Sequence, residues 1–368
     1  MSDNSMRKRR ATLARGKGPN PRFKARLVFV ALASLVLVTA LLAESCAPRR
    51  HRAPAGRRPL VGFSLDSLVV ERWKRDLDVL ESSVQELGAD FVYRVADQDA
   101  SVQERQVREL ADLGIDVLVI VPNDADRLSP VVSEVRKRGI AVLSYDRLVR
   151  KAGVNLYISF DNYKVGELMA KAAYAVRPTG RWLILNGAKN DHNAVLLNQG
   201  VHGVIDPAIL GGAIKIIGES WPDSWDSEAA RSSLEQGLAT GLGISAIISG
   251  NDMLAEAAIG VLSENGLAGK VIVVGQDADL SACQRIAEGL QYATIYKPID
   301  ILAKRAAACA VSLAKDEPIA ADSTIDDGRS QIPFIRLEPI LVTKDLLDST
   351  VIKDGFHSAA DVYRNLAR

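Results

Sequence analysis

Cysteine and histidine, from which metal centres and many covalent catalysts are built, are scarce in this chain: it has three cysteines and four histidines among 368 residues. The histidines are scattered and form no His-Glu-x-x-His pair, which argues against a zinc enzyme. The chain also lacks a Gly-x-Gly-x-x-Gly turn after a strand, a Walker-type Gly-Lys-Ser/Thr loop and a Gly-x-Ser-x-Gly elbow. We therefore expect no cofactor, no nucleotide chemistry and no serine hydrolysis.

An overall excess of charge is absent as well. Lysine and arginine number 46 against 45 aspartates and glutamates, a net charge of +1, so no global field favours a nucleic-acid partner. The basic residues are concentrated locally: nine lie between residues 7 and 26, directly ahead of an uncharged apolar run over residues 27–43. This order is typical of a secretory signal or an uncleaved anchor, and the flanking charges make a buried core helix the weaker alternative.

Cys46 follows the apolar run in the sequence LLAESC, which resembles a relaxed lipoprotein signal that would leave this cysteine as the lipidated first residue. Ala43 replaces the usual large aliphatic residue, and Glu44 is also unusual. Three interpretations of residues 1–46 therefore stay open: a lipoprotein signal, an uncleaved single-span anchor and a plain cleaved signal. All three place the folded part outside the cytoplasm, in the periplasm or at the outer face of a membrane. Residues 47–59 are basic and rich in proline, which predicts an extended tether to the membrane surface.

The remaining cysteines, Cys283 and Cys309, lie in apolar helical stretches and do not have CxxC spacing. An exported protein can form disulfides, so a bond between them is one interpretation. Buried free thiols are favoured, because cysteine is among the residues most often buried as a small apolar side chain.

From Leu60 onward, short β-branched runs alternate with amphipathic helical stretches, the pattern of parallel sheets covered on both faces. Two such halves follow each other, which predicts an α/β protein of two doubly wound parallel-sheet lobes joined by a multi-strand hinge. The helices of the first three units are expected to end at Gly88, Gly114 and Gly139. The expected boundaries are 60–162 plus 298–328 for the N-terminal lobe, 163–297 plus 329–360 for the C-terminal lobe, and 361–368 for a tail.

Polar residues follow several predicted strands at their carboxyl ends, where this architecture binds its ligands. Asp146 and Arg147 follow a strand of the first half, and Asn251 and Asp277 follow strands of the second. Aspartate and asparagine are also common N-caps of the next helix, so either role is open for each of them.

Aromatic residues make up only 5% of the chain, yet Trp73 and Trp225 stand in polar turns at the start of predicted helices, one in each half. Either indole could simply cover a core. As a pair they could stack on the two faces of a sugar ring. Lys297, at a strand end before Pro298, is either a ligand contact or a solvated lysine near the hinge.

The chain contains the segments VLSYDR, YISFDNYKVGE, NDHNA, GQDADL, TIYKPI and VIKDGFH. Together they resemble the ribose/galactose-type family of periplasmic substrate-binding proteins that serve ATP-driven sugar importers, and the similarity runs from Leu60 to His357. Three of the segments, YISFDNYKVGE, GQDADL and VIKDGFH, resemble the xylose branch of that family. The resemblance implies a type I periplasmic binding protein, monomeric and without catalysis, which delivers a monosaccharide, D-xylose, to an ABC permease and ATPase complex.

Matched position by position, the resemblance implies ten sugar contacts: Arg72, Trp73, Asp146, Arg147, Asp191, Asn193, Trp225, Asn251, Asp277 and Lys297. The family normally has asparagine at position 192, where this chain has His192, and the acidic and basic neighbours expected after Asp66 are missing. The roles of His192 and Asp66 therefore stay open. Galactose-type relatives hold calcium in a loop with EF-hand-like acid spacing, which this chain lacks, so no metal is expected.

Two other functions would use the same bilobed fold. A membrane-anchored sugar sensor that signals to a histidine kinase or chemoreceptor would need the same pocket, and it remains the alternative to transport. A transcription repressor of the lactose-repressor type would need an N-terminal helix-turn-helix, and an apolar export segment stands in its place.

Overall fold

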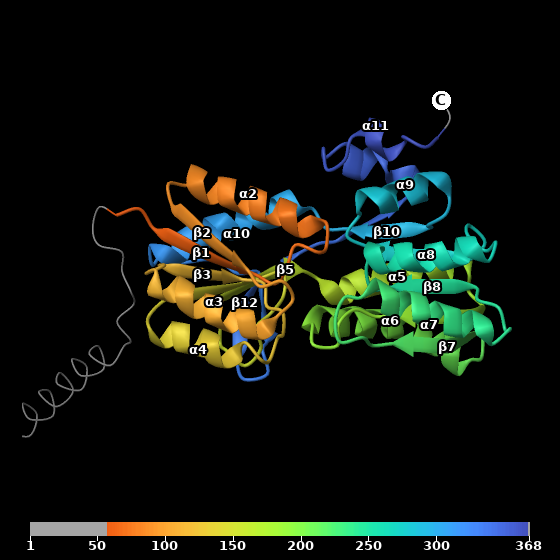
Figure 1. Cartoon of the computed structure of the whole chain (residues 1–368), viewed down its shortest axis with the longest axis horizontal. Helices are drawn as coiled ribbons and strands as arrows, with labels where there is room; N and C mark the ends of the chain where they lie inside the picture. The colour runs from red at the N-terminus through yellow and green to blue at the C-terminus, as the bar shows by residue number, and fades with distance from the viewer. Residues whose placement is uncertain (1–56, 367–368) are drawn as a thin grey trace, which may run out of the picture. The chain divides into compact units, whose positions relative to one another are not determined.

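The computed structural model describes residues 57–366, which form two α/β lobes (Figure 1). The expected signal or anchor segment and Cys46 lie outside the described residues, as does most of the expected tether. Within residues 57–366 no helix has the length and apolar character needed to cross a membrane.

The first lobe is built on a seven-stranded sheet in the order β11-β12-β5-β4-β3-β1-β2. Its strands are β1 (Leu60–Leu65), β2 (Asp90–Val95), β3 (Val117–Ile120), β4 (Ala141–Tyr145), β5 (Leu156–Phe160), β11 (Ser323–Asp326) and β12 (Gln331–Leu337). Neighbouring strands are parallel, except that β11 is antiparallel to β12. One face is covered by α2 (Arg72–Glu86) and α10 (Ile299–Ala314), the other by α3 (Ala100–Asp112) and α4 (Ser129–Lys137).

The second lobe is built on a six-stranded sheet in the order β13-β10-β9-β8-β6-β7. Its strands are β6 (Gly180–Leu185), β7 (Ile214–Ser220), β8 (Ala246–Ser249), β9 (Ile272–Gln276), β10 (Ala293–Tyr296) and the antiparallel β13 (Ile340–Thr343). One face is covered by α5 (Asn162–Val176) and α6 (His192–Leu210), the other by α7 (Ser227–Ala239) and α8 (Asp252–Glu264). A separate cluster near β10 and β13 holds α9 (Leu280–Glu288), the helical turns Lys344–Leu346 and Asp348–Ile352, and α11 (Ala359–Val362).

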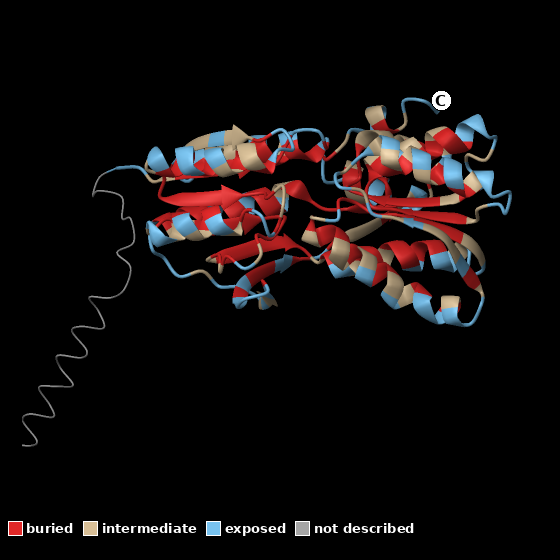
Figure 2. Ribbon diagram, turned by 60° about the horizontal axis from the view of Figure 1, so that its bottom comes forward, coloured by how far each residue is buried: buried red, intermediate tan, exposed pale blue. Residues whose placement is uncertain are grey.

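The burial of the strands follows from their sequences. β3 (VLVI) and β8 (AIIS) consist entirely of buried residues, as expected for parallel strands covered on both faces, and Figure 2 shows buried strands between half-exposed helices. The first helices end where the sequence predicts: Gly88, Gly114 and Gly139 have φ of 79°, 79° and 87°, a left-handed conformation that glycine adopts without a Cβ clash.

The predicted fold class is confirmed, but two boundaries are wrong. The predicted tail of residues 361–368 begins inside α11 (Ala359–Val362), whose Val362 is buried in the cluster around α9. The sequence assigns residues 329–360 to the C-terminal lobe, whereas β12 belongs to the sheet of the first lobe. β12 pairs in parallel with β5, so that Phe334 stands opposite Tyr157, and the two rings stack with their centroids 4.7 Å apart. Of the two strands within residues 329–360, only β13 joins the second sheet.

The chain passes between the lobes at three places: between β5 and α5, between β10 and α10, and between β12 and β13. The lobes also touch through Arg75 of α2, which donates a hydrogen bond from Nη1 to the carbonyl oxygen of Phe356 at 3.1 Å. The same guanidinium lies 4.7 Å from the centroid of the Phe356 ring and pairs with Asp300 at 2.9 Å.

The two cysteines within the described residues are free and buried, as predicted. Cys283 belongs to α9 of the second lobe, whereas Cys309 belongs to α10 and packs in the core of the first lobe. Burial raises the pKa of both thiols, which makes them poor nucleophiles.

Candidate functional site

A cavity lies between the lobes, at the carboxyl ends of strands from both sheets. All ten residues predicted from the sequence line it, together with Val70, Asn162 and Gln276. The first lobe supplies Arg72, Trp73, Asp146 and Arg147, and the second supplies Asp191, Asn193, Trp225, Asn251, Asp277 and Lys297. All ten are buried except Trp225, which is half-buried.

Each lobe directs one carboxylate into the cavity from a left-handed turn. Asp146 follows β4 with φ of 60°, and its N–H donates to the carbonyl of Ile158 in β5 at 2.8 Å. Asp277 follows β9 with φ of 96°, and its N–H donates to the carbonyl of Ile295 in β10 at 2.8 Å. A non-glycine residue in such a conformation costs about 1 to 3 kcal/mol. The two lobes therefore use the same strained turn at equivalent strand ends.

The carboxylates of these turns pair with cations. Asp146 lies 2.9 Å from Nη2 of Arg72, and Asp277 lies 2.7 Å from Nζ of Lys297 and 3.6 Å from Nη1 of Arg72. Burial by itself would raise the pKa of Asp146, but the charges of Arg72, Lys297 and Arg147 outweigh it and hold that pKa below its ordinary value. Asp146 is therefore ionised at neutral pH.

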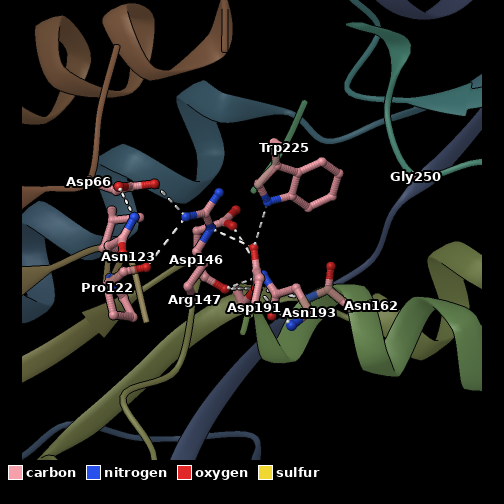
Figure 3. A network of polar contacts seen from close by, with 12 residues as sticks. Asp66, Pro122, Asn123, Asp146, Arg147, Asn162, Asp191, Asn193, Trp225 and Gly250 are labelled. Atoms are coloured by element: carbon pink, nitrogen blue, oxygen red, sulfur yellow. Dashed lines mark hydrogen bonds and ion pairs between the residues drawn. The ribbon is translucent and has the colours of Figure 1, made fainter. Parts of the chain in front are cut away.

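Arg147 connects the lobes through two carboxylates, as Figure 3 shows. Its Nη1 lies 2.8 Å from Asp66 of the first lobe, and its Nε lies 2.7 Å from Asp191 of the second. Asp66 also accepts a hydrogen bond from Asn123 Nδ2 at 2.8 Å. Asp66 is not among the residues that line the cavity. Its contacts give it the role that the sequence left open: it orients Arg147 from behind.

The strand-end residues of the second lobe are helix caps and cavity residues at once. Asp191 caps α6 by accepting from the N–H of Asn193 at 2.9 Å, while its other oxygen meets Arg147. Asn251 caps α8 through Oδ1, which accepts from the N–H of Leu254 at 2.9 Å. The two roles left open by the sequence are therefore compatible for these residues.

Asn193 forms another bridge between the lobes. Its Nδ2 donates to the carbonyl of Asp146 at 2.9 Å, and its Oδ1 accepts from the hydroxyl of Tyr157 at 3.2 Å. The amide thus binds the back of the Asp146 turn from the opposite lobe, so the position of that turn depends on both lobes.

The two tryptophans are held differently. Trp73 packs into the core beneath α2 with 3% of its surface exposed, and the guanidinium carbons of Arg72 and Arg147 lie 4.6 and 5.4 Å from its ring centroid. Trp225 donates from Nε1 to Asp191 at 3.2 Å. Its ring lies against Gly187, where a Cβ would come within 2.3 Å of the indole. Trp73 therefore contributes to both the core and the cavity wall. The position of the Trp225 ring requires glycine at residue 187.

Lys297 is 5% exposed and paired with Asp277, so the alternative of a solvated lysine is wrong. The sequence did not predict the cavity positions of Val70, Asn162 and Gln276. Gln276 precedes Asp277 at the same strand end, and this position could have predicted that it lines the cavity. Its Nε2 donates to the carbonyl of Gly250 at 2.6 Å.

Three polar atoms of the lining residues are buried without a hydrogen-bond partner: Trp73 Nε1, Gln276 Oε1 and Asp277 Oδ1, the last of which has only its ion pairs with Lys297 and Arg72. Buried donors and acceptors are normally satisfied, so these atoms favour a ligand with both hydrogen-bond donors and acceptors.

Residues 57–366 contain no group of three or more His, Cys, Asp or Glu side chains arranged to hold a metal ion. His192 is half-buried at the start of α6 and is not among the lining residues. Burial and the nearby charge of Arg150 lower its pKa, which favours the neutral imidazole at pH 7.

Comparison with known proteins identifies similar chains. A family model described as the periplasmic binding protein domain matches residues 61–318. The D-xylose-binding periplasmic protein of Haemophilus influenzae is 44% identical over 304 residues, which cover 82% of this chain and 92% of that protein. The protein of the same name from Escherichia coli is 40% identical over 329 residues, covering 89% of this chain and 98% of that one. A carbohydrate transporter solute-binding protein from Chloroflexus aurantiacus, solved in complex with D-glucose, superposes with a TM-score of 0.78 at 26% identity, covering 83% and 98% of the two chains.

Proposed function

This chain belongs to the periplasmic binding protein family, and we propose that it captures D-xylose between its two lobes and delivers the sugar to an ABC importer. The observation that carries the proposal is the charge balance of the cavity. Its lining contains three cations, Arg72, Arg147 and Lys297, and three carboxylates, Asp146, Asp191 and Asp277. Three positive charges against three negative ones leave no net charge, which favours a neutral ligand that both accepts and donates hydrogen bonds.

A pyranose fits this description. Its ring hydroxyls donate to the carboxylates and accept from the guanidinium and ammonium groups. Its apolar faces suit the indoles of Trp73 and Trp225, as carbohydrate faces stack on aromatic rings. Trp73 Nε1 and Gln276 Oε1, which have no hydrogen-bond partner in the protein, offer one donor and one acceptor to the same ligand.

The choice of xylose among sugars is supported by the two relatives of that name, which are 44% and 40% identical to this chain. An epimer with a misplaced hydroxyl would leave one of the buried polar groups unpaired, at a cost of about 1 to 3 kcal/mol. The cavity should therefore select between epimers by roughly 5-fold to 150-fold in affinity.

The proposal also includes the location of the protein and its attachment to a membrane. We infer an extracytoplasmic location, with residues 1–46 as an export signal and Cys46 as a lipidated residue that tethers the protein to a membrane. Palmitate labelling of the wild-type protein and of a Cys46→Ser variant tests the lipid. Label in the wild type alone supports it, and equal labelling of both excludes it.

The sugar is tested by titration calorimetry with D-xylose, D-ribose, D-galactose, D-glucose and L-arabinose. We expect D-xylose to bind most tightly and to raise the unfolding temperature, because a ligand of the folded protein stabilises it. Tighter binding of ribose or galactose would overturn the assignment of the ligand, and no binding by any of the five would overturn the function.

A further inference from the structure

A buried carboxylate outside the cavity holds the turn that carries Asp277. Asp252, the first residue of α8, is 0% exposed and does not line the cavity. Its Oδ2 accepts a hydrogen bond from the hydroxyl of Thr294 in β10 at 2.7 Å and from the N–H of Asp279 at 3.2 Å. Its Oδ1 accepts from Nε2 of Gln291 at 2.7 Å. Burying a carboxylate in this way is unfavourable unless such donors surround it.

The contacts of Asp252 lead directly to the turn. Thr294 donates to Asp252 and at the same time accepts from the N–H of Ala278 at 3.2 Å, using the same hydroxyl. The N–H groups of Ala278 and Asp279, the two residues after Asp277, are therefore both tied to Asp252, one of them through Thr294. Asp277 and Ala278 have φ of 96° and 56°, so two consecutive non-glycine residues are held in a conformation they would not adopt unaided.

The strand beneath the turn is shaped around this carboxylate. Gly275 in β9 lies so close to it that a Cβ there would come within 2.2 Å of Asp252 Oδ1. Gln291 is fixed in turn by Arg285, whose Nε donates to Gln291 Oε1 at 3.2 Å. The position of Asp252 therefore depends on a glycine, an amide and a guanidinium that do not line the cavity.

The first lobe holds its equivalent turn through hydroxyls that reach the backbone of the turn directly. The carbonyl of Asp146 accepts directly from the hydroxyls of Tyr157 at 2.8 Å and Ser159 at 2.6 Å, both in β5. β5 and β10 are the strands that follow the two turns, so hydroxyls from equivalent strands support both. In the second lobe the single hydroxyl of Thr294 binds an N–H, and it needs an acceptor for its own proton, which Asp252 supplies.

We propose that Asp252, acting through Thr294, is a positioning residue for sugar binding, because it keeps the Asp277 turn in the conformation that directs the Asp277 carboxylate into the cavity. This inference rests on the proposed function. It means that Asp252 and Thr294 increase the affinity for the sugar although neither of them lines the cavity.

The test compares isosteric threonine variants. Thr294→Val removes the linking hydroxyl but keeps the β-branched shape, and Thr343→Val makes the same change at the end of β13 in the same lobe, outside the cavity. Dissociation constants for D-xylose are measured by calorimetry on the whole chain, with thermal unfolding to confirm that each variant is folded. We expect Thr294→Val to weaken binding by about tenfold or more, and Thr343→Val to change it less than about twofold.

Substitutions of Asp252 give a graded series. Asp252→Asn keeps an oxygen acceptor for Thr294 but turns an NH2 group toward Nε2 of Gln291, so it should lose part of the affinity. Asp252→Ala removes the acceptor and should weaken binding at least as much as Thr294→Val does. A double-mutant cycle adds a readout that general loosening of the lobe would not produce. In an Asp277→Asn background, Thr294→Val should lose most of its effect. If Asp277→Asn removes binding entirely, the comparison of single variants decides.

The outcomes separate this inference from the proposed function. A wild-type protein that binds none of the sugars overturns the function. A wild type that binds xylose while a folded Thr294→Val variant binds it equally well overturns only the role of Asp252. An equal loss from Thr294→Val in the wild-type and Asp277→Asn backgrounds also overturns it, because the hydroxyl would then act independently of Asp277.

Discussion

The charged side chains that line the cavity form ion pairs with one another. Some of them also pair with residues that lie outside the cavity and would not contact a ligand. Asp66 is the clearest case, because it holds Arg147 from the side away from the cavity. Removing one member of a buried ion pair is strongly destabilising, since the other charge is left uncompensated. Residues behind the cavity therefore influence affinity as well as stability.

We predict that Asp66→Ala weakens binding of D-xylose by about tenfold or more, because Arg147 loses one of its two carboxylates. The matched control is Asp116→Ala. Asp116 is equally buried, but it accepts from the N–H of Leu60 at the opposite end of the first sheet. Calorimetry should show a large loss of affinity only for Asp66→Ala, and similar losses in the two variants would contradict the prediction.

Trp225→Ala should reduce affinity for D-xylose by about 30-fold or more, because the proposed stacking of the sugar on this indole is lost. Trp221 serves as the control: it is 37% exposed and bonded to Glu219 rather than to a cavity residue. Trp221→Ala should bind as the wild type does. Unchanged affinity in Trp225→Ala would remove Trp225 from the site.

His202 predicts a pH dependence that is independent of the ligand. Partial burial acts to lower its pKa, but the hydrogen bond with Asp206 and the charge of Glu219 together raise it above its ordinary value. Because the folded pKa is higher, the stabilisation is full below the unfolded pKa and is lost as the pH rises through the folded value.

Chemical denaturation of the wild type and of His202→Gln tests this. The stability advantage of the wild type should shrink as the pH rises from about 6 to about 8. A difference that stays constant or grows over this range would show that the imidazole is not charged in the folded protein.

At the level of helices and strands, local features were predictable and long-range pairing was not. The glycines at 88, 114 and 139 end their helices for reasons contained in the adjacent residues. The segment PFIRLEPILVT (residues 333–343) has strand propensity throughout. Nothing local shows that its first part pairs with β5 and its second part with β10. The role of Asp66 could not be predicted either, because its partner Arg147 is 81 residues away in the sequence.

The residues that line the cavity were predictable for a different reason. Strand ends of a parallel sheet lie at one edge, so Asp146, Arg147, Asn251 and Asp277 could be placed together from the alternating pattern alone. Asp191 and Asn193 came only from the resemblance to a family. Gln276 has no charge and is the last residue of β9, so its pattern is that of a buried strand residue, and only its place next to Asp277 marks it.

Packing of α5 against α6 predicts an intolerant position. A Cβ on Gly166 would come within 1.9 Å of the carbonyl oxygen of Leu197, so Gly166→Ala should destabilise the protein by about 1 to 3 kcal/mol or more. Gly260 in α8 is the control, because no atom lies within 4 Å of its added Cβ. Gly260→Ala should be neutral or stabilising by up to about 1 kcal/mol. Thermal unfolding compares the two, and equal melting temperatures would contradict the predicted helix contact.

At the scale of the whole described protein, the lobes meet in the cavity and also at Arg75, whose guanidinium contacts Phe356 of the other lobe. Contacts of this kind favour the arrangement in which the lobes are together, whether or not they touch the ligand. Affinity for the sugar is therefore shared between the cavity and the surfaces beside it.

We predict that Arg75→Ala weakens D-xylose binding by about threefold to thirtyfold, with faster dissociation and an unchanged order of preference among sugars. Stopped-flow tryptophan fluorescence measures the dissociation rate. Arg108→Ala is the control, because Arg108 pairs with Glu134 on the surface of the first lobe alone. A changed sugar preference in Arg75→Ala would indicate an effect inside the cavity instead.

The three passages of the chain between the lobes also constrain how the protein is made. β5 is complete at Phe160, but its neighbour β12 ends only at Leu337, and β10 receives β13 later still. During synthesis, β5 and β10 would each keep an unpaired edge until residues 331–343 have been made, and such edges are prone to aggregate. A chain truncated before residue 331 would leave both edges permanently exposed, so holding the nascent protein unfolded until residue 343 has been made would protect it.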